Sequence, residues 1–418
     1  MNILLKGITI ADPTSQHHLK TVDVRVEKGI ITEIGKIESK ASEKIIDQRA
    51  ILSPGFFDLN ATAGDPGFET KEDLNTLSAA ASAGGFTGLA IMPVAKPTVH
   101  NKSAVEYIKN SAKGLQTDIK AIGALSLNLE GKEMSEMYDM HLAGAVAFSD
   151  GPNPVQNDGF MSRALQYAQG FGGVIYSFPE NREIAGKAMI NESSNSILLG
   201  MKGNPSLAEE LQISRDLFLA AYHDAPIHIS TISTAGSVAM IKKAKKDGVK
   251  VTCDVAAHAL VLTEDVLSGF DSHYKVKPPL RGRSDVKALL AGVKDGTIDA
   301  VSSQHTPHEI EYKAVEFETA AYGMIALQTV LPLLIKAGLT ETQIAEKLSI
   351  APRAILGLDS NKIEVGNVAN WVLYAPEEKW TYSKQNNKSK SSNSPFLNTQ
   401  LTGKVIATYN NQQLKRYE

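Results

Sequence analysis

Short apolar runs alternate with helical patterns along most of this 418-residue chain. The apolar runs span 51–60, 88–94, 119–127, 143–150, 173–178, 226–233, 251–257 and 298–303. Helical patterns lie between them at 74–83, 103–113, 161–169, 207–222, 237–246 and 286–293. Roughly eight strand–helix repeats over about 250 residues predict a (β/α)8 TIM barrel. A doubly wound open sheet is the alternative, but no glycine-rich dinucleotide fingerprint follows the first strand.

Both ends of the chain read as short strands. Residues 22–26 alternate strictly between valine and charged side chains, and 371–374 and 404–409 resume the pattern near the other end. We therefore expect a small composite β domain from residues 1–50 plus 360–418, and a barrel domain at 51–359. The polar stretch 383–394 is predicted to be an exposed loop.

Composition and charge exclude several classes of protein. The net charge is −3 with 43% hydrophobic residues, so nothing points to a nucleic-acid or anionic-membrane partner. A single cysteine excludes a disulfide framework and a thiolate-cluster metal site. No signal peptide is visible, and the longest apolar run, at 329–335, is too short to span a bilayer. We expect a soluble, cytoplasmic protein.

A barrel carries its active site at the carboxyl ends of its strands. Histidines and carboxylates that converge there could bind a metal and activate water. For every candidate, however, a hydrogen-bonded core or loop residue is the simpler interpretation, and a satisfied core histidine is also the simpler interpretation of His228. No Ser-His-Asp, Cys-His or phosphate-loop arrangement can be assembled. The candidates at these strand ends are Asp150, His258, His305 and His308, with Asp58 and Asp65 further out.

Several longer motifs cover essentially the whole chain. They read PGFFD at 54–58, DPGFETKED at 65–73, AGGFT at 83–87, MP at 92–93, YKVKPPLR at 274–281, DGTIDA at 295–300, HTPH at 305–308 and NSPF at 393–396. Together these segments resemble the type I dihydroorotases of the cyclic amidohydrolase superfamily. The resemblance implies an amidohydrolase-type barrel with a small β-sandwich domain. It also implies a pyrimidine-biosynthesis reaction, the reversible hydrolysis of dihydroorotate to N-carbamoyl-aspartate.

The sequence departs from the family pattern where the chemistry takes place. In the family, a zinc-bound hydroxide attacks the ring carbonyl and an aspartate carries the proton. Here the metal-binding His-x-His pair is replaced by Asn60 and Thr62, the later histidine ligands by Ser177 and Thr231, and the catalytic aspartate by Gln304. The family's substrate-contacting Arg, Asn and Asn are replaced by Gly64, Val94 and Lys277.

Four positions keep the family residue and are interpreted as remnants of the substrate pocket: Asp150, Arg281, His305 and His308. Amide and hydroxyl groups are weak neutral ligands that do not replace imidazole for zinc. A glutamine cannot carry a proton, which removes a general acid–base contribution of about 10²–10⁴-fold. The sequence therefore predicts no catalytic residue and no metal ligand, and no cofactor is expected although the family uses zinc.

The leading hypothesis is a non-catalytic dihydroorotase-like protein, a pseudoenzyme that acts as a structural or assembly partner of aspartate transcarbamoylase. The resemblance supplies this partner, and a homo- or hetero-oligomer is expected. One alternative is an active metal-dependent cyclic amidohydrolase with a rearranged site built from Asp150, His258, His305 and His308. Another is a small-anion binding module that uses Arg281 and His308.

Overall fold

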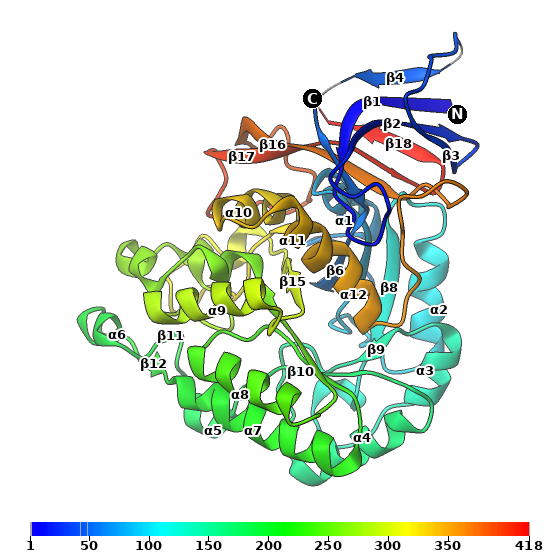
Figure 1. Cartoon of the computed structure of the whole chain (residues 1–418). Helices are drawn as coiled ribbons and strands as arrows, with labels where there is room; N and C mark the ends of the chain where they lie inside the picture. Colours follow the sequence, from blue (N-terminus) through cyan, green and yellow to red (C-terminus); the bar gives the residue numbers. More distant parts are fainter. Residues whose placement is uncertain (1, 42, 48, 418) are drawn as a thin grey trace.

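The computed structural model describes residues 2–41, 43–47 and 49–417. Eight parallel strands form the barrel, and Figure 1 shows its helices around them. A parallel bridge between Ala61 and His305 joins the first strand to the segment after the last. In spatial order the strands are β6 (Phe56–Ala61), β7 (Phe86–Ile91), β8 (Asp118–Gly123), β9 (Ala147–Phe148), β10 (Ile175–Ser177), β13 (Ile227–Ile229), β14 (Val251–Ala256) and β15 (Ala300–Ser302). The predicted TIM barrel is confirmed.

The helices lie outside the strands and bury one face each against them. The six predicted helical patterns correspond to α1 (Leu74–Ala83), α2 (Lys102–Ser111), α4 (Asp158–Gln169), α7 (Ser206–His223), α8 (Ala235–Lys246) and α9 (Arg283–Asp295). Side-chain caps at Asp73, Asn101 and Asn157 fix the starts of α1, α2 and α4. Not predicted were α3 (Met137–Ala143), α5 (Arg182–Ala185), α6 (Ser194–Leu198), α10 (Val330–Lys336), α11 (Glu341–Ala345), α12 (Ala351–Ile355) and the short pair β11 (Ile190–Asn191) and β12 (Gly203–Asn204).

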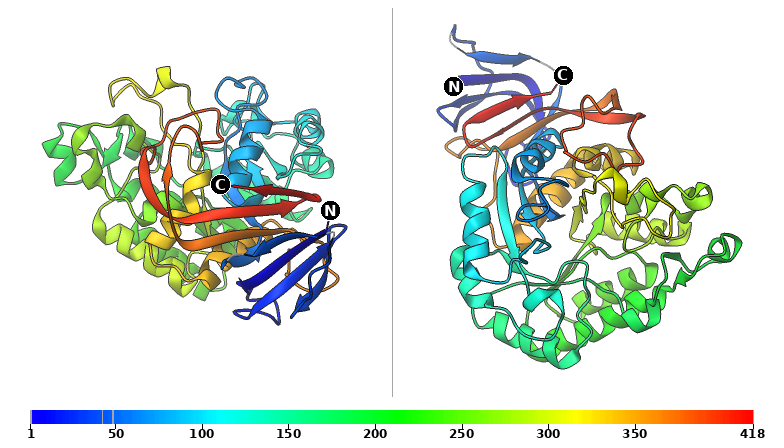
Figure 2. Two further views of the ribbon diagram at one scale, coloured as in Figure 1. Left: turned by 90° about the horizontal axis from the view of Figure 1, so that it is seen from above. Right: turned by 180° about the vertical axis from the view of Figure 1, so that it is seen from behind.

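A second sheet is assembled from both ends of the chain (Figure 2). Its order is β18 (Gln413–Arg416), β17 (Thr399–Asn410), β16 (Trp371–Tyr382), β5 (Ile51–Pro54), β1 (Asn2–Ile10), β2 (Thr21–Glu27) and β3 (Ile30–Gly35), with β4 (Lys44–Asp47) paired to β1. One face has its own apolar core around Trp371, Leu373 and Tyr409. On the other face Val372, Tyr374 and Leu401 join the core of the barrel. The expected small β-sandwich domain is thus present.

Two sequence-based expectations need correction. The run 51–60 is not one barrel strand, because β5 pairs with β1 and β16 in the terminal sheet before β6 enters the barrel. The polar stretch 383–394 is a loop, but it is not simply exposed. Ser391 and Asn393 are buried against the barrel loops: Ser391 donates to the Lys71 carbonyl, and Asn393 accepts from the His308 N–H and donates to the Thr306 carbonyl.

The division into domains at 1–50 plus 360–418 and 51–359 stays a proposal. Within the described ranges, no helix is both long enough and apolar enough to cross a bilayer.

Candidate functional site

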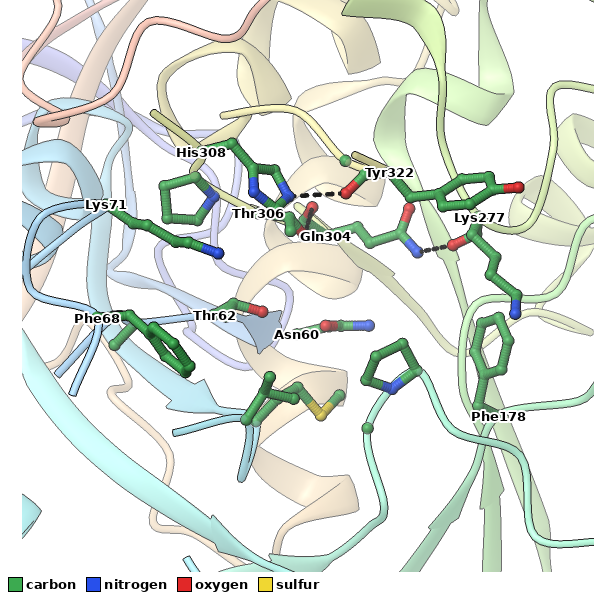
Figure 3. A pocket seen from close by; sticks show the side chains of 18 of the residues that line it. Asn60, Thr62, Phe68, Lys71, Phe178, Lys277, Gln304, Thr306, His308 and Tyr322 are labelled. Carbon is green, nitrogen blue, oxygen red and sulfur yellow. Dashed lines mark hydrogen bonds between the residues drawn. The ribbon is translucent and has the colours of Figure 1, made fainter. Parts of the chain in front are cut away.

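A cavity of about 450 Å³ opens at the mouth of the barrel (Figure 3). Phe68, Phe178 and Tyr322 form part of its wall, and Lys71 and Lys277 bring two ammonium groups to it. The cavity occupies the end of the barrel at which enzymes of this architecture carry their active sites. The sequence-predicted positions that line it are Asn60, Thr62, Gly64, Val94, Lys277, Gln304 and His308.

Two residues that replace the family's zinc-binding histidines bond to each other across the mouth. Asn60 follows the buried part of β6, and its Nδ2 donates to Thr231 Oγ1 at 3.1 Å and to Ser230 Oγ at 3.4 Å. The Thr231 backbone N–H donates to the buried Asp254 carboxylate at 2.6 Å. Thr62 lines the cavity beside them, with its backbone N–H donating to the His305 carbonyl at 2.8 Å. Asn60 and Thr231 are therefore engaged with each other rather than free to bind a ligand.

Ser177 and Asp150 each bond to a buried neighbour and do not line the cavity. Ser177 Oγ donates at 2.5 Å to Oδ2 of Asp216, a buried residue of α7. Asp150 Oδ1 accepts from the backbone N–H groups of Leu125 and Ser126 at 3.0 and 2.9 Å. Burial raises the pKa of Asp150, while these hydrogen bonds act in the opposite direction. Asp150 therefore fixes the loop after β8.

Gln304 and Lys277 are linked through the backbone. Gln304 Nε2 donates to the Lys277 carbonyl at 2.6 Å, so its amide holds two loops of the mouth together. Lys277 Nζ pairs with Glu180 at 2.7 Å and lies 5.7 Å from the centre of the Phe178 ring. Its charge is thus already partnered within the protein.

Gly64 has no space for a side chain. A Cβ built there would lie 2.0 Å from the Phe68 carbonyl oxygen and 2.6 Å from that of Glu72. The Gly64 N–H donates to the same Glu72 carbonyl at 2.8 Å. Val94 lies against Gly151, whose added Cβ would come within 2.9 Å of Val94 Cγ2. The backbone around position 64 therefore excludes the arginine that the resemblance places there.

The two histidines of the HTPH motif have different surroundings. His305 is buried, and its Nδ1 accepts from the Ala326 N–H at 3.1 Å, which places the ring proton on Nε2, 3.4 Å from Glu72. His308 lines the cavity and donates from Nε2 to the Tyr322 carbonyl at 2.9 Å. Burial lowers the pKa of His308 to about 4, so its ring is neutral at pH 7.

Arg281 does not reach the mouth cavity. Its side chain is buried, donating to Ser233 Oγ at 3.0 Å, to Asn191 Oδ1 at 2.9 Å and to the Asn204 carbonyl at 2.7 Å. Arg281 therefore holds loops together and does not face the mouth cavity. His258 is also buried, and burial lowers its pKa to about 4.

Polar side chains also lie inside the barrel, and the sequence pattern did not indicate which of them contact one another. His228 bonds to Thr252 and Asp254, which confirms the interpretation of a satisfied core histidine. Asp58 accepts from Ser303 at 2.7 Å, and burial raises its pKa to about 6. Tyr176 lies against the His228 ring with centroids 4.2 Å apart. Period-2 alternation in strands this short cannot distinguish the inward from the outward face.

Several residues that line the cavity were not singled out as site residues, among them Phe68, Lys71, Phe178 and Tyr322. Lys71 Nζ lies 5.1 Å from the Phe68 ring centre and 5.3 Å from that of Tyr312, and Figure 3 shows it turned toward the cavity. Lys71 belongs to the segment DPGFETKED, which follows the first barrel strand. That position could have indicated from the sequence that Lys71 lies near the mouth of the barrel.

Comparison with known proteins identifies the family. A family model described as dihydro-orotase-like matches residues 49–237. Curated dihydroorotases from Trichlorobacter lovleyi and Acetivibrio thermocellus are 40% and 41% identical over 415 and 413 residues. The matches cover 98% and 97% of this chain and 97% of each relative. This chain belongs to the dihydroorotase family.

Solved structures agree on the fold. L-hydantoinase (dihydropyrimidinase) from Arthrobacter aurescens superimposes with a TM-score of 0.87 at 23% identity, covering 100% of this chain and 96% of that one. Dihydropyrimidinase from Brevibacillus agri superimposes with a TM-score of 0.83 at 21% identity, covering 99% of this chain and 95% of that one. At these identities the likeness supports the amidohydrolase-type barrel with its terminal sheet and carries no information on substrate.

The expectation that no cofactor is involved needs correction. Full-length similarity to dihydroorotases places the chain among metal-dependent amidohydrolases, so zinc is the cofactor to be considered for this family member.

The residues at the mouth do not fit the family's zinc. In the part of the chain that the structure describes, no three His, Cys, Asp or Glu side chains are grouped so as to hold a metal ion. Asn60 and Thr231 offer neutral oxygens and already bond to each other. Asp150, His258, His305 and His308, the alternative ligand set, are likewise not grouped as a site.

Proposed function

We propose that this dihydroorotase-family chain does not hydrolyse dihydroorotate and instead serves as a structural partner of aspartate transcarbamoylase. The observation that carries the first part is Gln304. It occupies the position of the family's proton-carrying aspartate, and its amide is hydrogen-bonded to the Lys277 carbonyl at 2.6 Å. An amide at this position neither accepts nor returns a proton at neutral pH, which costs about 10²–10⁴-fold in rate.

Gly64 supports the same proposal from the side of substrate binding. The resemblance places an arginine here that would pair with the substrate carboxylate through two parallel hydrogen bonds. The carbonyl oxygens of Phe68 and Glu72 fill the space that its Cβ would need. The mouth of the barrel therefore has no space for an arginine at position 64 that would bind the substrate carboxylate.

A direct assay tests the loss of activity. The purified chain is incubated with zinc at stoichiometric and tenfold excess, and dihydroorotate and N-carbamoyl-aspartate are followed by chromatography. A curated relative, such as the dihydroorotase of Acetivibrio thermocellus, serves as the positive control. We expect no turnover above the uncatalysed rate. Turnover within a hundredfold of the control would refute the proposal.

The partnership with aspartate transcarbamoylase rests on the family resemblance and on the general suitability of a rigid barrel as an assembly surface. Co-expression with the transcarbamoylase of the same organism, followed by gel filtration, tests it. Co-elution at a fixed stoichiometry is expected, and separate elution would contradict it. The cytoplasmic location expected from the sequence stays a prediction.

The second candidate is an active cyclic amidohydrolase, which the names of the relatives favour. The same assay decides between the two, because added zinc gives any unrecognised ligand set its metal. If turnover appears, His258→Leu should abolish it under the rearranged-site hypothesis.

A third candidate is the small-anion binding module, favoured by the Lys71 ammonium group in the cavity wall, whereas the His308 ring beside it is neutral at pH 7. Arg281, the other residue expected to serve it, is engaged elsewhere. A rise in Tm with millimolar dihydroorotate or N-carbamoyl-aspartate would support it, and no shift would exclude it.

A further inference from the structure

The outward face of α7 differs from that of the other long barrel helices. The exposed positions of α7 carry no charge: they are Leu207, Leu211, Ser214, Phe218, Ala221 and Tyr222. The following helices are built in the usual way, since α8 exposes Lys242, Lys243 and Lys246, and α9 exposes Arg283, Lys287, Lys294 and Asp295. Exposed apolar residues that gather on one helix indicate an interaction surface.

These side chains form one continuous stripe. At 100° per residue the six positions fall within an arc of about 100° on the helix surface. The opposite face of α7 is buried against the barrel through Ile213, Leu217 and Ala220. Phe218 and Tyr222 are 79% and 78% exposed. Side chains of this size rarely remain in water without a partner.

The order of residues in the stripe is self-complementary. Leu207 and Tyr222 lie equally far from the middle of the helix, and so do Leu211 and Phe218. Across a two-fold axis at the centre of α7, an antiparallel second copy would set each leucine against an aromatic ring. Ser214 lies next to that axis, where a small side chain permits close approach of the two helices. This is the reciprocal pairing that an isologous dimer requires.

We propose that this stripe of α7 is the contact between two copies of this chain in a two-fold dimer. The two aromatic rings supply roughly a third to a half of the 800 Å² or so per subunit that a standard interface buries. Ile197 and Leu198, both 82% exposed, lie on α6, the short helix that projects from the barrel ahead of α7 in the chain (Figure 1). This inference does not depend on the proposed function.

The oligomeric state of the full chain tests the proposal. Sedimentation equilibrium of the purified wild type should give the mass of two chains. Phe218→Glu should weaken dimerisation at least a hundredfold, because it places two charges in the dimer contact. Leu142→Glu, on α3 and 65% exposed, changes a similarly exposed apolar residue and should leave the dimer intact.

A charge pair tests the register. Leu211→Lys and Phe218→Glu should each weaken dimerisation, whereas the double variant should recover at least tenfold of the lost affinity. In that chain each lysine meets the glutamate of the other copy, and the seven-residue separation keeps the two apart within one helix. Circular dichroism confirms that the variants are folded. A monomeric wild type, a dimeric Phe218→Glu variant or a double variant without recovery would overturn the proposal, as would a stripe that binds only aspartate transcarbamoylase.

Discussion

At the scale of single residues, the mouth is fixed by backbone as well as by side chains. Gly64 lies between its hydrogen-bonded neighbours Phe68 and Glu72, whose carbonyl oxygens point at the place a Cβ would take. Changing the side chains around the cavity would therefore not recreate the family's substrate site. The loop would first have to move.

Gly64→Ala tests this close approach. A Cβ 2.0 Å from the Phe68 carbonyl forces the loop to shift, and we expect a loss of about 1–3 kcal/mol in the free energy of unfolding, measured by urea denaturation. Gly269→Ala is the matched control, since its Cβ meets nothing within 4 Å. Equal stability of the two variants would contradict this prediction, because it would mean that the loop around Phe68 moves at no cost in free energy.

His258 gives a second prediction at this scale. Burial lowers its pKa from the ordinary 6.5 to about 4, so the neutral ring is favoured in the folded state. Its contribution to stability is fully present above pH 6.5 and is lost as the pH falls toward 4. The free energy of unfolding that is lost by pH 5.5 is about 1 kcal/mol.

In urea denaturation at pH 7.5 and 5.5, His258→Leu should therefore lose less stability on acidification than the wild type. Asp58, whose pKa is raised to about 6 by burial, acts in the opposite direction. It is present in both proteins and cancels in the comparison. An unchanged pH dependence would contradict the assignment.

Which residue types occupy the mouth could be predicted from the sequence, because strand ends of a barrel are recognisable positions. Their partners could not. Asp150 accepts from residues about 25 positions away, and Arg281 joins segments 48 to 90 positions away. Such contacts depend on how loops close over one another, and no local periodicity encodes that.

At the scale of elements, Arg281 holds the β11–α6–β12 insertion to the body of the barrel. Its guanidinium group joins Asn191 at the end of β11 and Asn204 at the end of β12 to Glu209 on α7, at 3.6 Å for the carboxylate. β11 and β12 are two residues long each, which is too short for a sequence pattern. A buried arginine thus holds this insertion to the barrel, in addition to the apolar contacts of Ile190 and Met201.

Arg281→Met should lower the free energy of unfolding by about 3–5 kcal/mol, because it leaves the buried Glu209 carboxylate without its cationic partner and Asn191 Oδ1 without its donor. Arg283→Met, an exposed arginine paired with Asp265, should cost less than about 1 kcal/mol. Urea denaturation of both variants measures the difference. A loss of stability below about 1 kcal/mol for Arg281→Met would contradict this structural role and leave Arg281 as a possible ligand-binding residue.

At the scale of the whole molecule, the buried amide of Asn410 links the terminal sheet to the barrel, beside the apolar contacts of Val372 and Tyr374. Asn410 Nδ2 donates to the carbonyls of Thr87 and Gln116 at 3.0 and 2.8 Å, and its Oδ1 accepts from Asn370 at 2.9 Å. A composite sheet was predictable, since both chain ends show strand patterns. This attachment was not, because it joins residues about 300 positions apart.

Asn410→Ala tests whether the terminal sheet and the barrel unfold as separate units. The only two tryptophans, Trp371 and Trp380, both lie on β16, so tryptophan fluorescence follows the sheet alone. Far-UV circular dichroism follows mainly the barrel helices. In the variant, each buried group left without its partner costs about 1–3 kcal/mol, and this cost falls on the junction.

We therefore expect the two urea transitions to coincide in the wild type and the fluorescence transition to come first in Asn410→Ala. Asn110→Ala, exposed on α2, is the control and should leave both unchanged. Early loss of the fluorescence signal would support the proposed boundaries at residues 50 and 360, because a sheet that unfolds alone has a core of its own. If both signals still moved together in the variant, the sheet and the barrel would form one cooperative unit and the division would be wrong.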